Sequence, residues 1–162
     1  MPALKKFYLL ASHASETSTA AFKEIAKGPA LPNLEEIEFW CVTAECADFI
    51  TFVRKHLRTL ETVNPDFLEL ENGSEEDLQL LLHDMRDAAI THNLINFTSM
   101  LIRLNDDSVR FPELRHIWFE DLDDPDFDDW VRVGCSENMY LKGKTEVVEG
   151  LEVMIGCMEV GW

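Results

Sequence analysis

The chain has 162 residues, with 14 Lys and Arg against 31 Asp and Glu, and its formal net charge is −17. This length is typical of one domain, and a hydrophobic content of 46% excludes a wholly disordered protein. The acidic balance argues against binding to nucleic acid or to an anionic membrane, because both require a basic surface. We therefore expect a basic protein partner, and neither a nucleic-acid nor a membrane partner.

The cysteines and the first residues of the chain indicate a compartment. The four cysteines lie at 41, 46, 135 and 157 and form no pattern with zinc-ligand or redox spacing. So few cysteines favour a reducing environment. The apolar run at 7–11 is shorter than the roughly 7–15 residues of a signal peptide or the roughly 20 of a membrane span. We expect a cytoplasmic or nuclear protein.

Strand-like segments recur along the chain with a Leu-x-x-Ile-x-Phe pattern. The closest pair is LPNLEEIEF at 31–39 and FPELRHIWF at 111–119. Weaker copies begin at Leu4, Leu60 and Leu94, so the starts at 4, 34, 60, 94 and 114 lie 30, 26, 34 and 20 residues apart. The pattern predicts parallel strands near 5–10, 35–40, 60–64 and 115–119.

Helical patterns lie between the first of these strands, and they predict helices near 18–27, 44–56 and 75–90. Each carries one apolar stripe, as in Cys46, Phe49, Ile50, Val53 and Leu57, or in Leu78, Leu81, Leu82, Met85 and Ala89. A single stripe indicates a helix that packs on one side only. Thr43 and Ser74 stand where N-caps belong, and a cationic His56 would suit a helix C-terminus.

Because strand and helix patterns recur together, we predict an α/β leucine-rich-repeat-like solenoid. It would comprise four to five strand–helix units with a parallel sheet over residues 1–119, and stacked units would share one core. An ordinary α/β or α+β domain with core leucines at similar intervals is the alternative. For residues 120–162 we predict an acidic loop followed by an irregular β-rich tail with a hairpin turn at 142–144. We do not expect this segment to be a separate domain. Uncapped ends of the array would permit a homo-oligomer.

Four short motifs carry a resemblance to a known family. They are Leu31-Pro32-Asn33-Leu34, Phe52 to His56, Thr59-Leu60 and Gly73-Ser74. Residues 30–120 or so resemble the degenerate leucine-rich-repeat region of filamentous-fungal F-box-type proteins. The resemblance implies substrate recognition for a cullin-type ubiquitin ligase. No F-box is visible in this chain, so a binding role is what the resemblance implies here.

No motif indicates catalysis, and we predict that the chain is not an enzyme and has no catalytic residue, no metal and no cofactor. The acidic run at 120–129 lacks the spacing of a calcium-binding loop, because aspartates occupy the position that requires Gly. Gly143-Lys144-Thr145 lacks the first Gly of a phosphate-binding loop, since Asn138 stands there. The alternatives are a small hydrolase or metal-dependent enzyme that uses 120–129, or a truncated product without its own activity.

Strand alternation suggests a binding surface. Leu34, Ile37 and Phe39 would point into the core, so the residues between them would face outward. The candidate partner-binding residues in this outward row are Tyr8, Glu36, Glu38, Trp40, His116, Trp118 and Glu120. Trp and Tyr often dominate the energy of protein interfaces. We therefore expect a non-catalytic protein–protein interaction module, unless a loop or the tail covers Trp40 or Trp118.

Overall fold

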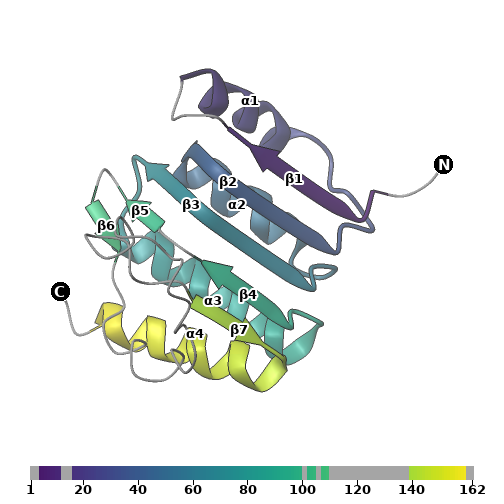
Figure 1. Cartoon of the computed structure of the whole chain (residues 1–162), viewed down its shortest axis with the longest axis vertical. Helices are drawn as coiled ribbons and strands as arrows, with labels where there is room; N and C mark the ends of the chain where they lie inside the picture. Colours follow the sequence, from purple (N-terminus) through teal and green to yellow (C-terminus); the bar gives the residue numbers. More distant parts are fainter. Residues whose placement is uncertain (1–3, 12–15, 100–101, 105–106, 110–138, 160–162) are drawn as a thin grey trace, which may run out of the picture.

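The computed structural model describes residues 4–11, 16–99, 102–104, 107–109 and 139–159. In chain order, the described elements are β1 (Lys6–Leu10), α1 (Glu16–Lys27), β2 (Glu36–Glu45), α2 (Cys46–His56), β3 (Thr62–Glu71), α3 (Glu75–Thr91), β4 (Asn96–Ser99), β5 (Ile102–Leu104), β6 (Asp107–Val109), β7 (Met139–Lys142) and α4 (Lys144–Glu159). They form an α/β fold with one mixed, mostly parallel sheet (Figure 1).

The sheet runs in the order β1-β2-β3-β4-β7, and the first four of these strands are parallel. β7 pairs antiparallel with β4. β5 continues alongside β3 in parallel, and β6 pairs antiparallel with β5. The parallel strands predicted near 5–10, 35–40 and 60–64 are therefore confirmed. The strand predicted near 115–119 lies outside the described residues.

The strand register has the spacing seen in the sequence. Lys6 pairs with Glu36, 30 residues later, Glu36 with Thr62, 26 later, and Thr62 with Asn96, 34 later. The same three intervals separate the leucines at 4, 34, 60 and 94. Three of these leucines, at 34, 60 and 94, are fully buried. The apolar pattern of the sequence thus sets which residues meet across the sheet.

The helices form one layer against the sheet. They contact each other in chain order, α1 with α2, α2 with α3 and α3 with α4. In Figure 1, α2 and α3 lie behind the strands. The helices predicted near 18–27, 44–56 and 75–90 are confirmed as α1, α2 and α3.

The two predicted helix N-caps have different outcomes. Ser74 caps α3 through a capping box, in which its hydroxyl accepts from the Asp77 amide and the Asp77 carboxylate accepts from the Ser74 amide. Thr43 is not a cap. β2 continues to Glu45, so Thr43 lies buried within the strand. Glu45 occupies the cap position but makes no side-chain capping bond to α2.

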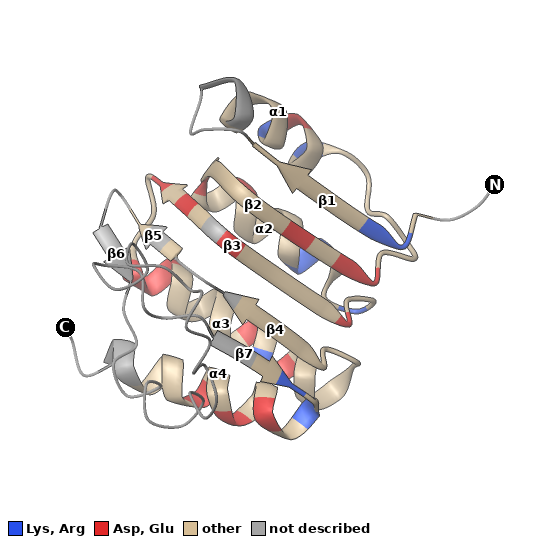
Figure 2. Cartoon of the chain, viewed as in Figure 1, with Lys and Arg blue, Asp and Glu red and all other residues tan. Residues whose placement is uncertain are grey.

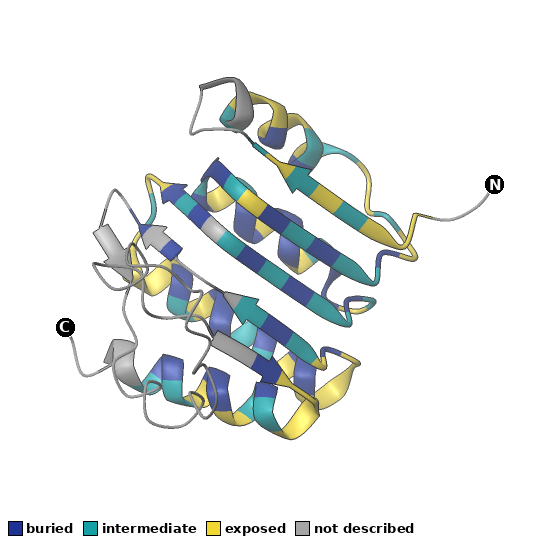
Figure 3. Cartoon of the chain, viewed as in Figure 1, coloured by how far each residue is buried: buried dark blue, intermediate teal, exposed yellow. Residues whose placement is uncertain are grey.

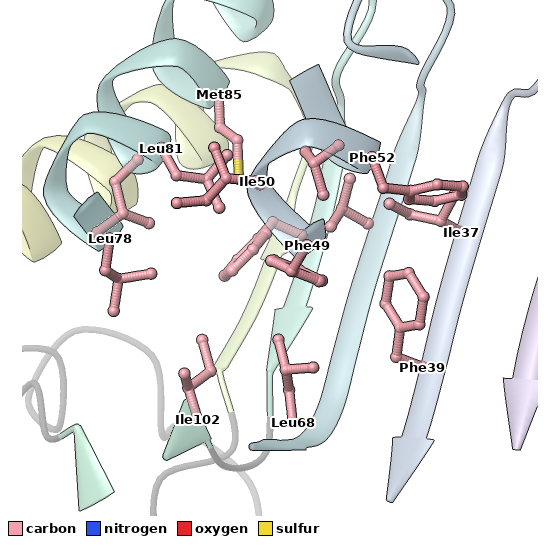
Figure 4. Close-up of a cluster of buried hydrophobic side chains, with 14 of the residues drawn as sticks. Ile37, Phe39, Phe49, Ile50, Phe52, Leu68, Leu78, Leu81, Met85 and Ile102 are labelled. Atoms are coloured by element: carbon pink, nitrogen blue, oxygen red, sulfur yellow. The ribbon is translucent and has the colours of Figure 1, made fainter. Parts of the chain in front are cut away.

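A continuous apolar core fills the space between sheet and helices. Phe22, Phe39, Phe49 and Phe52 pack as a cluster, with the Phe39 and Phe49 ring centroids 5.4 Å apart. Figure 4 shows side chains of α2 and α3 meeting those of the strands in this core. Ile37 and Phe39 point inward as predicted and are fully buried.

Strict alternation stops at one level of the sheet. Cys41 has a positive φ of 55°, and the three residues beyond it, Val42, Thr43 and Ala44, are all buried. Two consecutive residues, Trp40 and Cys41, thus separate the buried Phe39 from the buried Val42. The pairing with β3 keeps its register on both sides of this point. The change of face thus occurs without a slip between the strands.

The expected irregular β-rich tail is wrong for residues 139–159. They form the short strand β7 and the 16-residue helix α4. The hairpin turn predicted at 142–144 is also wrong, because the chain at Gly143, where φ is 90°, connects a strand to a helix. Val147, Leu151, Met154 and Ile155 are buried with spacing i, i+4, i+7 and i+8. This spacing is helical, but the valines and glycines of the segment have low helix propensity and favoured the β interpretation.

Candidate functional site

The candidate site is the face of the sheet opposite the core, which we call the open face. Its described residues are Lys6, Tyr8 and Leu10 on β1, Glu36, Glu38 and Trp40 on β2, Thr62, Asn64 and Asp66 on β3, and Asn96 and Thr98 on β4. The described helices all bury side chains against the other face. Figure 3 shows the alternation of buried with less buried residues along β2 and β3.

Large apolar and aromatic side chains gather where β1 meets β2. Tyr8 is 54% exposed, Leu10 is 74% exposed and Trp40 is 39% exposed. The register pairs Leu10 with Trp40 and Tyr8 with Glu38, so the three lie on neighbouring positions of two strands. Sequence reasoning missed Leu10, although it lies two positions after Tyr8 and alternation alone places it on the same face.

Glu36 links the charged and aromatic residues of this corner. Its carboxylate lies 2.5 Å from the Lys6 ammonium and accepts a 2.9 Å hydrogen bond from the Tyr8 hydroxyl. The Lys6 ammonium holds the pKa of the Glu36 carboxyl below its usual value, while the bond to Glu36 raises the pKa of Tyr8. Glu36 is therefore ionised at neutral pH and orients the Tyr8 ring along the sheet.

Polar side chains continue the open face over β3 and β4. Thr98 donates to the Asn64 side-chain oxygen at 2.7 Å, and Asn96 donates to the Thr62 hydroxyl at 3.2 Å. These bonds join residues at equivalent levels of adjacent strands. They link β3 to β4 across the open face, so this part of the face is polar.

Charge is distributed unevenly across the open face. Its acidic residues, Glu36, Glu38 and Asp66, lie on the central strands β2 and β3. Lys6 lies on β1, and Lys142 is at the end of β7. Figure 2 shows the acidic positions on β2 and β3. A partner that spans the open face would therefore meet negative charge at its centre.

The structure brings together four of the seven predicted site residues. Tyr8, Glu36, Glu38 and Trp40 lie on one face of two paired strands. His116, Trp118 and Glu120 lie outside the described residues, as does the acidic run at 120–129.

The predicted cationic His56 is wrong. Its ring is only 2% exposed, its Nε2 accepts from the Leu31 amide at 3.0 Å, and its Nδ1 lies 2.8 Å from the Phe52 carbonyl oxygen. An Nε2 that accepts a hydrogen bond carries no proton, so the ring is neutral with its proton on Nδ1. Burial lowers the pKa of His56 in agreement with this geometry. The residue holds the connection between α1 and β2.

Cys46 offers little nucleophilic character. Cys46 is buried, and burial raises the pKa of its thiol to about 11. A thiol with that pKa is protonated at neutral pH, and the thiolate is the reactive form. Cys41 lies partly exposed beside Trp40 on β2. No described side chain pairs with either cysteine in the manner of a catalytic base.

Two further properties concern the described residues alone. Among them, no group of three or more His, Cys, Asp or Glu side chains is placed to hold a metal ion. Within the same part of the chain, no helix is both long and apolar enough to cross a membrane.

Comparison with known proteins found no matching family model, no matching curated protein and no matching solved structure.

Proposed function

We propose that this chain is a non-catalytic recognition module that binds a basic protein partner through the open face. The observation that carries the proposal is the exposure of Tyr8, Leu10 and Trp40 on two neighbouring strands. Exposed aromatic residues on a rigid sheet bury a large area at little cost in conformational entropy, and they are frequent hot spots. Acidic residues on β2 and β3 lie beside them and would attract a basic partner.

The wider role follows from the sequence resemblance. We propose that the strand–helix units form a leucine-rich-repeat-like solenoid, a proposal supported by register spacings of 30, 26 and 34 residues that match the leucine spacing. From the resemblance to F-box-type proteins, we also propose that the chain selects substrates for a cullin-type ubiquitin ligase. The low cysteine content supports action in the cytoplasm or nucleus.

The test compares two exposed apolar residues on opposite faces. Trp40 lies on the open face, whereas Leu80 lies on α3 and is 55% exposed. Partners captured from cell extract with the parent chain are purified, and their affinity is measured for the parent, Trp40→Ala and Leu80→Ala. We expect Trp40→Ala to weaken binding by about 2 kcal/mol or more. Leu80→Ala should leave the affinity unchanged.

Thermal melting of each variant first confirms that it folds. If Trp40→Ala binds every partner as tightly as the parent does, the open face is not the recognition surface. Loss of binding in Leu80→Ala alone would place that surface on the helix layer.

A second variant tests the charge of the partner. Glu38→Lys reverses one charge at the acidic centre of the open face. We expect slower association with the same partner and a weaker dependence of the association rate on salt, because electrostatic steering acts on the encounter. An association rate that rises with Glu38→Lys would contradict a basic partner.

A further inference from the structure

The outer edge of β1 offers backbone hydrogen-bonding groups. The Lys5 carbonyl accepts from the Glu36 amide at 3.0 Å, and the Ala11 amide donates to the Trp40 carbonyl at 3.0 Å. In a parallel pair, alternate residues direct both backbone groups to the same neighbour. The odd-numbered residues of β1 thus bond to β2, and Lys6, Tyr8 and Leu10 direct their backbone groups to the outer edge. Among the described strands, β2 is the only partner of β1.

Both faces of this edge carry apolar side chains that are partly or largely exposed. On the open face, Tyr8 and Leu10 are more than half exposed. On the core face, Phe7 and Leu9 pack against the core but are only partly buried. An exposed apolar edge strand is the feature that proteins usually cover or charge, because it templates pairing with another strand.

From this geometry, we infer that β1 pairs with β1 of a second copy of the chain. The two strands run antiparallel about a two-fold axis at Tyr8, and the Tyr8 residues of the two copies form a hydrogen-bonded pair. This register places Phe7 of each copy beside Leu9 of the other on the core face. On the open face, it places Lys6 of each copy beside Leu10 of the other. One patch thereby complements itself, as a two-fold interface requires.

The charge of residues 4–11 favours a second copy of the chain as the partner of β1. In a chain of net charge −17, residues 4–11 contain two lysines and no acid. The proposed register sets Lys6 against Leu10 and Lys5 against Ala11, so no like charges face each other. A basic strand would meet Lys5 and Lys6 at this edge. Pairing through this edge therefore brings no acidic side chains of β1 together, and the edge is distinct from the acidic centre proposed for the partner.

The test uses two opposite charges at one exposed position. In the proposed register, position 10 of each copy lies opposite Lys6 of the other copy. Leu10→Lys therefore creates a repulsive Lys–Lys pair on each side of the axis, whereas Leu10→Glu creates an attractive Lys–Glu pair on each side. We expect Leu10→Lys to raise the dimer dissociation constant on the order of tenfold, and Leu10→Glu to lower it. Net charge alone predicts the reverse, because Leu10→Lys reduces the repulsion between two acidic chains and Leu10→Glu increases it. Sedimentation equilibrium of the full chain at several concentrations measures the constant.

Cysteine substitution tests the register independently. Residues of a hydrogen-bonded antiparallel pair have Cα atoms about 5.5 Å apart, within disulfide range. Under oxidation, Tyr8→Cys should therefore form a covalent dimer through residue 8, identified by peptide mapping. Leu10→Cys should not, because its two copies lie about 13 Å apart along the paired strands.

The proposal is overturned by a parent chain that is monomeric up to submillimolar concentration, an outcome that would leave the edge to a strand of another protein. It is equally overturned by a dimer that Leu10→Lys strengthens and Leu10→Glu weakens, or by equal cross-linking of the two cysteine variants.

Discussion

The two ends of the sheet are built differently. At the β7 end, an antiparallel strand and helix α4 complete the layers, and Leu141, Val147 and Leu151 are buried to 1% exposure or less. At the β1 end, Phe7 packs against Phe52 of α2 with the ring centroids 5.5 Å apart, but Phe7 and Leu9 remain partly exposed. The same strand–helix construction thus yields a covered end and a bare end. We therefore expect stability to depend on the β7 end, and association to depend on the β1 end.

At both the β1 end and the β7 end of the sheet, a lysine bonds to carbonyl groups at a helix C-terminus. Lys55 of α2 donates to the carbonyls of Ala26, in the last turn of α1, and of Gly28, just after it. Lys144 of α4 donates to the Ile90 carbonyl at the end of α3. A lysine from the next helix in the layer therefore satisfies free carbonyls at each end. At the β1 end, the buried His56 also accepts a hydrogen bond from the Leu31 amide.

The largest expected effect comes from truncating leucines at opposite ends. Leu151 is fully buried in α4, whereas Leu10 is 74% exposed on β1. We expect Leu151→Ala to lower the free energy of unfolding by about 2–5 kcal/mol. Leu10→Ala should change it by no more than about 0.5 kcal/mol. Urea denaturation of both variants measures the difference, and equal losses would show that the ends are not distinct in stability.

Two glycines of α4 sharpen the description of the covered end. A Cβ on Gly150 would lie 2.7 Å from Cδ2 of the buried Leu141, whereas a Cβ on Gly156 meets nothing within 4 Å. Gly156→Ala should therefore stabilise the protein by about 0.5–1 kcal/mol through helix propensity alone. Gly150→Ala should instead destabilise it by about 1–3 kcal/mol, because the core must shift.

Thermal or urea unfolding of the two glycine variants gives the comparison directly. If both are stabilised equally, α4 does not pack against β7 as described.

The smallest expected effect is a pH dependence confined to the β1 end. His56 in the folded chain has a pKa below the ordinary value of 6.5. The unfolded or locally opened chain therefore binds more protons, and the contribution of His56 to stability is complete above pH 6.5 and is lost as the pH falls through the folded pKa. Protonation of Nε2 would also break its bond from the Leu31 amide.

Hydrogen exchange, corrected for intrinsic rates, measures this prediction. As the pH is lowered from neutral to mildly acidic, the backbone amides of residues 28–35 should lose protection from exchange before the amides of β3 do. A His56 that titrates at or above pH 6.5 by NMR would contradict it.

The sequence was informative where one pattern governs one element. Ile37 and Phe39 alternate with exposed residues, and the stripes of α2 and α3 have helical spacing, so these elements were predictable. α4 was not, because Val147 and Gly150 favour other structures and only packing against Leu141 and α3 selects the helix. Tertiary context here outweighed local propensity.

The candidate site was predictable only in part for a similar reason. Alternation placed Tyr8, Glu38 and Trp40 on one face, but an apolar residue such as Leu10 is assigned to the core until the edge of the sheet is known. The neutral state of His56 was also beyond the sequence, since it depends on a hydrogen bond from Leu31, 25 residues away.

The most direct test of the central claim is a hydroxyl-radical footprint of the chain with and without its purified partner. Both samples have the same chain concentration, so that pairing through β1 is matched. We predict that the partner protects Tyr8 and Trp40 from oxidation and leaves Leu80 and Ile90, which are exposed on α3, unchanged. Protection of Leu80 and Ile90 with no change at Tyr8 and Trp40 would contradict recognition through the open face.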